Sequence, residues 1–547
     1  MLKLKKTLII ALSVSIVALG LIGCQKGKNE KATSNNLLNQ ESVESNKERT
    51  DLVIAVDTGM VENGFDPTTG WGRYGSPLFQ STLVKRGEDN KIVNDLATNY
   101  KVSNDGLTWT FNIRKDVKFT DEQPLTAKDI VYTYNTTAKS GSVVDLNIID
   151  SVTQQGDYTI NFKLKHPQST FINIVEKLGI VPKHAHNDKY RDNPIGSGPF
   201  KLVQLDKEQQ FIVGANTNYY GDKPFFKKLT FLYLNEDAGL AAAKSGKVDI
   251  LYVTPTLGKE KIKGMHLLEV QSVDNRGIIF PYVKSGHKGN KGNPVGNDVT
   301  SDSAIRKAIN FAVDRKSLVN GILNGFGTEC YSICDGLPWY NPDSKIKDAD
   351  IEKAKKILVD GGWKDTNSDG ILEKNGLKAE FTLLYPSNDA LRQSLALAVA
   401  DQMKPIGIKI NVKGKGWDEI PKRMYSDAVM LGWGNLSPLE LYNVYSSKTM
   451  GLEFFNSGYY LNPKVDEYLN KALLALSEEE ANNYFKKAQW DGITGFSAQG
   501  DAPWTWLVNI NHLYFVRDGL DIGEQRIQPH GTGWPITNNI AKWKWEN

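Results

Sequence analysis

Residues 96–135 read LATNYKVSNDGLTWTFNIRKDVKFTDEQPLTAKDIVYTYN, and the pattern of this stretch predicts two elements of secondary structure. Apolar and polar residues alternate across Trp109–Ile113, which predicts a half-buried strand. Thr126 then precedes a helix expected over Ala127–Thr133, because a threonine at this position caps free backbone N–H groups. Asp129 lies in the first turn, where a negative charge is favourable. The stretch therefore predicts a strand followed by a helix in an α+β unit.

Other stretches in the first half of the chain also predict strands. Ile160–Leu164 alternates like Trp109–Ile113, and half-buried strands of this kind usually pair antiparallel. Leu52–Ala55 predicts an earlier strand. A corner rich in glycine and proline, PIGSGPF, lies at Pro194–Phe200, and the KLVQL that follows it predicts a strand, as does Lys227–Leu234.

The second half of the chain alternates helices and strands, which indicates an α/β lobe. Helices are expected over 305–312, over Ile351–Leu358 with a stop at Gly361 and Gly362, and over Asp389–Met403. Strands are expected over Ala379–Tyr385, Ile408–Val412 and Ala428–Gly432.

The composition is that of an ordinary globular protein, with 40% hydrophobic and 24% charged residues. A chain of 547 residues is too long for one core. The 66 basic and 63 acidic residues give a net charge of +3 that is spread along the chain, which does not favour a nucleic-acid partner. The sequence lacks GxSxG, HExxH and GxxxxGK[ST], so an enzyme is not expected. Carboxylates brought together by the fold leave a secreted hydrolase as a remote alternative.

The N-terminus, residues 1–23, resembles a bacterial lipoprotein signal. Basic Lys3–Lys6 precede the apolar run Leu8–Gly23, which spans about sixteen residues and is too short to cross a membrane. The resemblance implies cleavage before Cys24, which would carry acyl chains and anchor the protein to the outer face of the cell membrane. An uncleaved signal anchor is the alternative. Residues 24–50 are polar and charged, which predicts a flexible tether.

Leu96–Asn135 closely resembles the signature of the family 5 extracellular solute-binding proteins, which serve oligopeptide, dipeptide and nickel ABC importers. Four further blocks match that family in the same order: PIGSGPF at Pro194–Phe200, NYYGDKP at Asn218–Pro224, AIRKAINFAVDRKSLV at Ala304–Val319 and AKKILVDGGWKDTNSDGILEKNG at Ala354–Gly376. The resemblance runs from about Asp51 to the C-terminus. One departure is Glu122, where the family usually has a glycine after Asp121.

The resemblance implies an α/β fold of the two-lobed, periplasmic-binding-protein-like kind (type II, cluster C), with an extra α+β subdomain inserted in the first lobe. The core of the first lobe would comprise 51–82, 194–275 and 490–547. The inserted subdomain would comprise 83–193, and the second lobe 276–489.

The resemblance also implies a function. The protein would be an extracytoplasmic, monomeric binding protein without a cofactor, which captures a short peptide or similar small polar solute between its lobes. It would present this solute to an ABC permease driven by ATPase subunits. Capture of a nickel or other metal chelate is the alternative.

One candidate ligand site is the segment Trp71–Gly75, which lies where the first lobe of the family opens toward its cleft. Arg73 offers a planar fork for a carboxylate, while Trp71 and Tyr74 offer ring faces. A turn with a solvated arginine is the alternative, because arginine is mostly exposed in proteins.

The second candidate is GWGNLSPLE at 432–440, from which Trp433 and Asn435 are the expected ligand residues. In peptide-binding relatives this region supplies an aspartate for the ammonium group of the peptide, and here Asn435 or Glu440 would have to replace it. In nickel-binding relatives a histidine can follow the proline, where this chain has Leu439. Asn275 and Arg276 lie where the family crosses between lobes and are hinge or ligand candidates.

Metal ligands and a disulfide have weaker support. His184 and His186 form an HxH motif without a further ligand nearby, so a surface loop is expected there. The run 365–376 begins like a calcium loop but ends in Gly376 instead of glutamate, so a turn is expected. Cys330 and Cys334 suit either a disulfide or two buried thiols in one turn.

Overall fold

The computed structural model describes residues 48–56, 64–141, 144–289 and 291–546. Residues Arg49–Asn547 form one compact unit. The expected signal, Cys24 and the tether up to residue 47 lie outside the described residues. No helix within the described part is both apolar enough and long enough to span a membrane.

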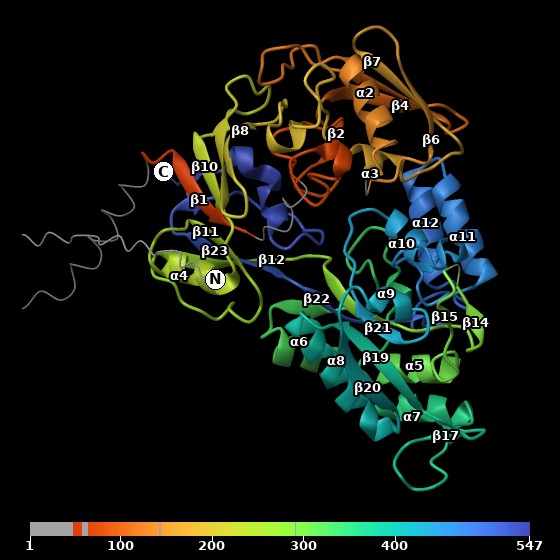
Figure 1. Ribbon diagram of the computed structural model, residues 1–547. Coiled ribbons are helices and arrows are strands. Elements are labelled where there is room, and N and C mark those ends of the chain that lie inside the picture. The colour runs from red at the N-terminus through yellow and green to blue at the C-terminus, as the bar shows by residue number, and fades with distance from the viewer. Residues whose placement is uncertain (1–47, 57–63, 142–143, 290, 547) are drawn as a thin grey trace, which may run out of the picture. The chain divides into compact units, whose positions relative to one another are not determined.

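A seven-stranded mixed sheet contains the N-terminal strand of this unit (Figure 1). In spatial order its strands are β12 (Met265–Val270), β23 (His512–Arg517), β11 (Ile250–Val253), β1 (Asp51–Ala55), β10 (Lys228–Leu232), β9 (Gln210–Ala215) and β8 (Phe200–Asp206). β1 pairs in parallel with β10 and β11, and the other pairs are antiparallel. The strands expected at Leu52–Ala55, at KLVQL and at Lys227–Leu234 are confirmed as β1, β8 and β10.

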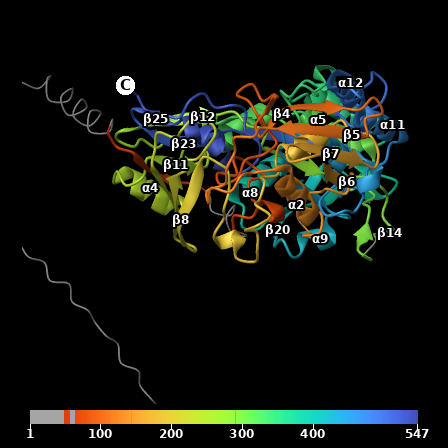
Figure 2. The same cartoon turned by 90° about the horizontal axis from the view of Figure 1, so that it is seen from above.

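A four-stranded antiparallel sheet with two helices is built in part from residues 96–135, and Figure 2 shows α2 beside this sheet. The elements are β4 (Ala97–Val102), β5 (Thr108–Ile113), β7 (Thr159–Leu164), β6 (Ile149–Gln154), α2 (Ala127–Thr137) and α3 (Phe171–Val175). The helix begins at Ala127 as expected, and Asp129 in its first turn accepts the backbone N–H of Thr126 over 2.9 Å. This sheet and its helices enclose a core of their own around Phe111, Tyr134 and Phe162.

A six-stranded mixed sheet holds most of the second half of the chain. In spatial order its strands are β16 (Gly327–Glu329), β22 (Trp504–Ile510), β13 (Asn275–Ile279), β21 (Ala428–Leu431), β19 (Glu380–Pro386) and β20 (Lys409–Lys415). Its helices are α5 (Ser303–Ala312), α6 (Arg315–Ile322), α7 (Ile351–Asp360), α8 (Ala390–Met403), α9 (Ile420–Arg423), α10 (Leu439–Tyr445), α11 (Pro463–Leu474) and α12 (Glu478–Gln489).

Two hydrophobic cores lie on opposite faces of this sheet, as an α/β layer structure requires. Ile278 packs with α5, α7 and α8, whereas its neighbour Ile279 packs with α10, α11 and α12. The helices and strands expected from the second half of the sequence are confirmed here.

Two chain crossings connect the seven-stranded and six-stranded sheets. β12 leads into β13, and β22 leads into β23, so the paired strands continue from one sheet into the other. The backbone N–H of Ile510 donates to the carbonyl of Asp274 over 2.8 Å at the crossing. β22 lies within 490–547, which is expected in the first lobe, yet its hydrogen bonds place it in the six-stranded sheet. The lobe boundaries as a whole stay a prediction.

Shorter elements complete the fold. These are α4 (Glu236–Lys244) and the two-stranded pairs β2 (Val84–Arg86) with β3 (Ile92–Asn94), β14 (His287–Lys288) with β15 (Pro294–Val295), β17 (Glu373–Lys374) with β18 (Leu377–Lys378) and β24 (Leu520–Asp521) with β25 (Lys544–Trp545). The 3-10 helices are Pro67–Thr69, Tyr190–Asp192, Pro342–Ser344, Lys404–Ile406, Ser447–Thr449 and Trp534–Lys542.

The corner PIGSGPF needs glycine for space, because a Cβ added at Gly196 would lie 1.8 Å from the carbonyl oxygen of Phe79. We expect Gly196→Ala to lower the free energy of unfolding by about 1–3 kcal/mol, as overpacking does. Urea unfolding measures this. The control is Gly321→Ala in α6, where a Cβ would meet no atom within 4 Å. It should leave stability unchanged or raise it by up to about 1 kcal/mol, and equal effects of the two variants would contradict the steric argument.

Candidate functional site

Arg73 and Tyr74 follow β1, and their side chains contact each other. The guanidinium carbon of Arg73 lies 4.7 Å from the centre of the Tyr74 ring, a cation–π distance. The Nε of Arg73 is buried without a hydrogen-bond partner, and no carboxylate among the described residues pairs with this guanidinium. A half-buried, unpaired guanidinium on an aromatic ring is suited to an anionic ligand.

Tyr74 connects this pair to the segment 432–440. The rings of Tyr74 and His530 contact edge to face with 5.7 Å between their centres. The backbone N–H of His530 donates to the carbonyl of Gly434 over 2.8 Å. Two candidate segments that lie far apart in the sequence are therefore joined through His530.

Glu440, the first-turn carboxylate of α10, folds back on the turn that precedes this helix. Its two oxygens accept the backbone N–H groups of Gly434 and Asn435, each over 3.2 Å. Burial raises the pKa of Glu440 to about 7, although these hydrogen bonds and nearby Lys177 and His530 act in the opposite direction. The carboxylate therefore fixes the shape of the turn.

Asn275 has a structural role at the start of β13. Its side chain is 0% exposed, accepts the backbone N–H of Trp433 over 2.9 Å and donates to the carbonyl of Ile333 over 3.2 Å. The Trp433 ring stacks on Phe455 with 5.4 Å between centres, and its indole N–H has no partner among the described residues. Asn275 thus positions the backbone of Trp433 and is not itself accessible to a ligand.

Arg276 is 7% exposed and pairs with Asp274, which is 4% exposed. An Nη1–Oδ1 distance of 2.5 Å joins the two, and His530 Nδ1 lies 2.9 Å from the same Asp274 oxygen. Burial alone would raise the pKa of Asp274, but Arg276 and His530 hold it well below its ordinary value. Arg276 therefore belongs to a buried ion cluster at the crossing between the sheets.

Lys177 lies just after α3 and contacts the same turn from the four-stranded-sheet side. Its Nζ donates to Oδ1 of Asn435 over 2.7 Å. Arg86, at the end of β2, donates to the carbonyl of Leu436 over 2.6 Å and pairs with Glu176 over 3.3 Å. We name the set Arg73, Tyr74, Lys177, Asn435 and His530 the polar junction.

Sequence reasoning missed Lys177 and Arg86. Each is one basic residue in an ordinary polar context, and such residues are usually solvated. Nothing in the sequence links Lys177 to Asn435, because the two residues come together only in the folded chain.

Trp71 lies apart from the polar junction, in the core of the seven-stranded sheet. Its ring is 3% exposed, packs against Phe65, Phe79 and Trp534, and donates its N–H to the carbonyl of Pro77 over 2.7 Å. Its indole therefore has a packing role, and Tyr74 supplies the ring face that contacts Arg73.

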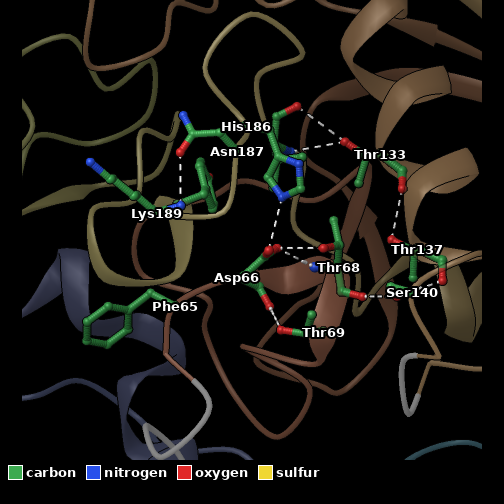
Figure 3. A network of polar contacts seen from close by, with 12 residues as sticks. Phe65, Asp66, Thr68, Thr69, Thr133, Thr137, Ser140, His186, Asn187 and Lys189 are labelled. Atoms are coloured by element: carbon green, nitrogen blue, oxygen red, sulfur yellow. Dashed lines mark hydrogen bonds and ion pairs between the residues drawn. The ribbon is translucent and has the colours of Figure 1, made fainter.

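The two histidines of the HxH motif contact different carboxylates. His186 Nε2 lies 3.0 Å from Asp66 Oδ2, and Tyr132 contacts its other ring nitrogen over 3.0 Å. Figure 3 shows the contact between His186 and Asp66, and it also shows Ser140, which donates to the carbonyl of Thr68 over 2.6 Å. These contacts fasten α2 to the segment after β1. The described residues contain no cluster of three or more metal-ligating side chains.

Two other expectations are resolved by the contacts. The run 365–376 forms a turn before β19, in which Asp365 accepts backbone N–H groups of its own loop. Cys330 and Cys334 are free and buried, so the alternative of two thiols is confirmed and the disulfide is wrong.

A cavity of about 880 Å³ lies elsewhere, beside β1 and β11. Its lining includes Val56, Gly64 and Tyr252 but no member of the polar junction. Val56 and Gly64 border residues 57–63, which the structure does not describe, so we assign no ligand to this cavity.

Comparison with known proteins agrees with this fold. Protein XP55 of Streptomyces lividans is 33% identical over 489 residues, covering 86% of this chain and 85% of that protein. The oligopeptide-binding protein AppA of Bacillus subtilis is 28% identical and covers 95% of this chain and 96% of its own length. The crystal structure of NikZ from Campylobacter jejuni in complex with Ni(L-His) superposes with a TM-score of 0.75 and 26% identity, covering 91% of this chain and 99% of that one.

The structural relatives have the two-lobed fold that the sequence predicts, which confirms the fold class. Residues 91–451 match the family described as bacterial extracellular solute-binding proteins, family 5 middle. Because this match spans more than half of the sequence, the chain belongs to the family 5 bacterial extracellular solute-binding proteins.

Proposed function

We propose that this protein is the substrate-binding component of an ABC importer and that it holds a small, carboxylate-bearing solute at the polar junction. The observation that carries the proposal is the half-buried guanidinium of Arg73, which stacks on Tyr74 and has no carboxylate partner among the described residues. A carboxylate would complete this site with a charge-assisted pair. Trp433, whose indole N–H is buried and has no partner among the described residues, and Asn435 would contact the rest of the solute.

Binding would favour closure through contacts made by both lobes, and the closed form would be presented to the permease and its ATPase. No covalent chemistry is required of this chain, in keeping with a family of binding proteins. The lobe assignment given above and action as a monomer belong to the same proposal. We also propose anchoring to the outer face of the membrane through acylated Cys24, on the strength of the sequence pattern at residues 1–24.

Two classes of solute suit the site. A short peptide is the first, because AppA is named as an oligopeptide-binding protein. A nickel chelate is the second, because NikZ was crystallised with Ni(L-His) and a chelate brings its own metal ligands and carboxylates. The lack of an aspartate in 432–440 favours the second class, since a peptide ammonium would need a charged partner there.

A thermal-shift panel on the purified protein tests the proposal. Di- to pentapeptides are compared with nickel alone and with nickel plus histidine, because a ligand at a hundred times its dissociation constant adds about 2.7 kcal/mol of stability. A shift with peptides only would establish a peptide receptor, and a shift only with nickel plus histidine a chelate receptor. The absence of any shift across the panel would reject both solute classes.

A further inference from the structure

Lys177 brings an ammonium group to the turn that precedes α10. The side chain is half-buried and its Nζ lies 2.7 Å from Oδ1 of Asn435. The same Asn435 donates its backbone N–H to Glu440 over 3.2 Å, so an amide oxygen and a carboxylate are held together at this turn. These are the groups that accept hydrogen bonds from an ammonium group.

The charged form of Lys177 is energetically unfavourable at this position. Burial lowers the pKa of Lys177, and the neighbouring Arg86 and Arg73 lower it further, while Glu176 and Glu440 raise it. No carboxylate among the described residues lies within ion-pair distance of its Nζ. Burying an ammonium group whose one partner is a neutral amide costs free energy, so the rest of the fold must hold Lys177 in this position.

The charges around Lys177 are also unbalanced. Arg86 is paired with Glu176, but Arg73 and Lys177 lack carboxylate partners among the described residues. Glu440 is the further acid that acts on Lys177, and it already accepts two backbone N–H groups. The polar junction thus carries excess positive charge, which an anion relieves and a second ammonium increases.

We propose that Lys177 permanently occupies the hydrogen-bonding position at Oδ1 of Asn435, beside the turn that Glu440 holds, so that the solute enters the polar junction as an anion with no ammonium group at that position. The inference rests on the proposed function and deepens it by naming the charge of the solute. It makes Lys177 a specificity-determining residue that excludes peptides bound through a free amino terminus.

Whether the ammonium group of Lys177 fills this position can be tested without knowledge of the solute. Lys177→Ala removes the ammonium and most of its stem, and n-propylammonium chloride then supplies a substitute. We expect the melting temperature of Lys177→Ala to rise by about 2 °C over an equal concentration of sodium chloride. Wild type, Lys183→Ala at an exposed position, and Lys177→Ala with 1-propanol should show no such rise. Equal responses of all proteins to propylammonium would overturn the inference.

The charge of the solute is tested with Lys177→Met, which keeps an apolar stem of similar size and removes only the ammonium group. A tetrapeptide and its N-acetylated form are compared by calorimetry. Wild type should bind the two forms within about threefold of each other, whereas Lys177→Met should favour the free amine by about tenfold or more, since its ammonium position is vacant. A tenfold preference of wild type for the free amine, unchanged in Lys177→Met, would overturn the inference.

The two hypotheses fail in different ways. If wild type binds no peptide and no nickel–histidine complex, the proposed function fails, and propylammonium rescue alone decides whether Lys177 fills an ammonium position. If wild type binds nickel–histidine only, Lys177→Met should weaken that binding by about tenfold or more, because one of two unpaired cations is lost. Unchanged chelate affinity would then count against Lys177 as part of the site.

Discussion

Arg73→Ala is expected to weaken solute binding by about 2–5 kcal/mol, the usual loss when one partner of a desolvated charge pair is truncated. The guanidinium has no carboxylate partner of its own among the described residues, so a bound carboxylate would lose its main counter-charge. Calorimetry with whichever solute the thermal-shift panel identifies gives the affinity. An affinity equal to that of wild type would remove Arg73 from the site.

Arg114 offers a matched control for this experiment. Its guanidinium carbon also lies over a tyrosine ring, 4.4 Å from the centre of Tyr220, but its charge is already paired with Asp116 over 2.8 Å. Arg114→Ala therefore removes the same chemical group from a tyrosine face and should leave solute affinity unchanged. A comparable loss in both variants would indicate a general effect of charge instead of a contact with the solute.

Asp274→Ala is expected to lower the free energy of unfolding by about 3–5 kcal/mol, because the buried guanidinium of Arg276 would lose its counter-charge. Urea unfolding measures the loss. The double variant Asp274→Leu with Arg276→Met should recover most of it, since no buried charge is then left unpaired. Glu88→Ala, which removes the exposed partner of Lys542, should cost less than about 1 kcal/mol.

The same ion cluster makes the stability of the folded protein depend on pH. The pKa of Asp274 is lower in the folded protein than in the unfolded chain, so the unfolded chain binds more protons as the pH falls. The stability contributed by Asp274 is therefore present above about pH 4 and is lost as the pH falls below this. Asp274→Ala should lose less stability than wild type between about pH 5 and pH 3, and equal losses would show that another carboxylate dominates acid unfolding.

Local signals in the sequence predicted many elements but not all of their ends. The helix expected to stop at Thr133 continues to Thr137. Within it, the hydroxyls of Thr133 and Thr137 donate to carbonyls one turn earlier, over 2.7 and 2.8 Å, so both polar side chains are accommodated in the helix. β22 was not expected, since all seven residues of Trp504–Ile510 are buried and show no alternation of the kind that marks Trp109–Ile113.

The candidate site was also predictable only in part, because burial and tertiary contacts decide the roles of several of its residues. Arg73 and Asn435 could be chosen because each lies in a distinctive run of aromatic, glycine and polar residues. The roles of Trp71 and Asn275 depend on burial, which local sequence does not specify. Lys177 joins the site through a tertiary contact with Asn435, and a single sequence contains no record of such pairs.

The position of β23 in the seven-stranded sheet has a consequence for how the molecule is made. β23 lies between β11 and β12, and its residues, His512–Arg517, are among the last in the chain. Until they are available, β12 has no neighbour in the sheet and one edge of β11 stays open. The sheet that begins at β1 is therefore completed only when this distant segment joins it, and pairings so distant in sequence form slowly. Formation of the seven-stranded sheet is therefore expected to lag behind that of the local helices and hairpins.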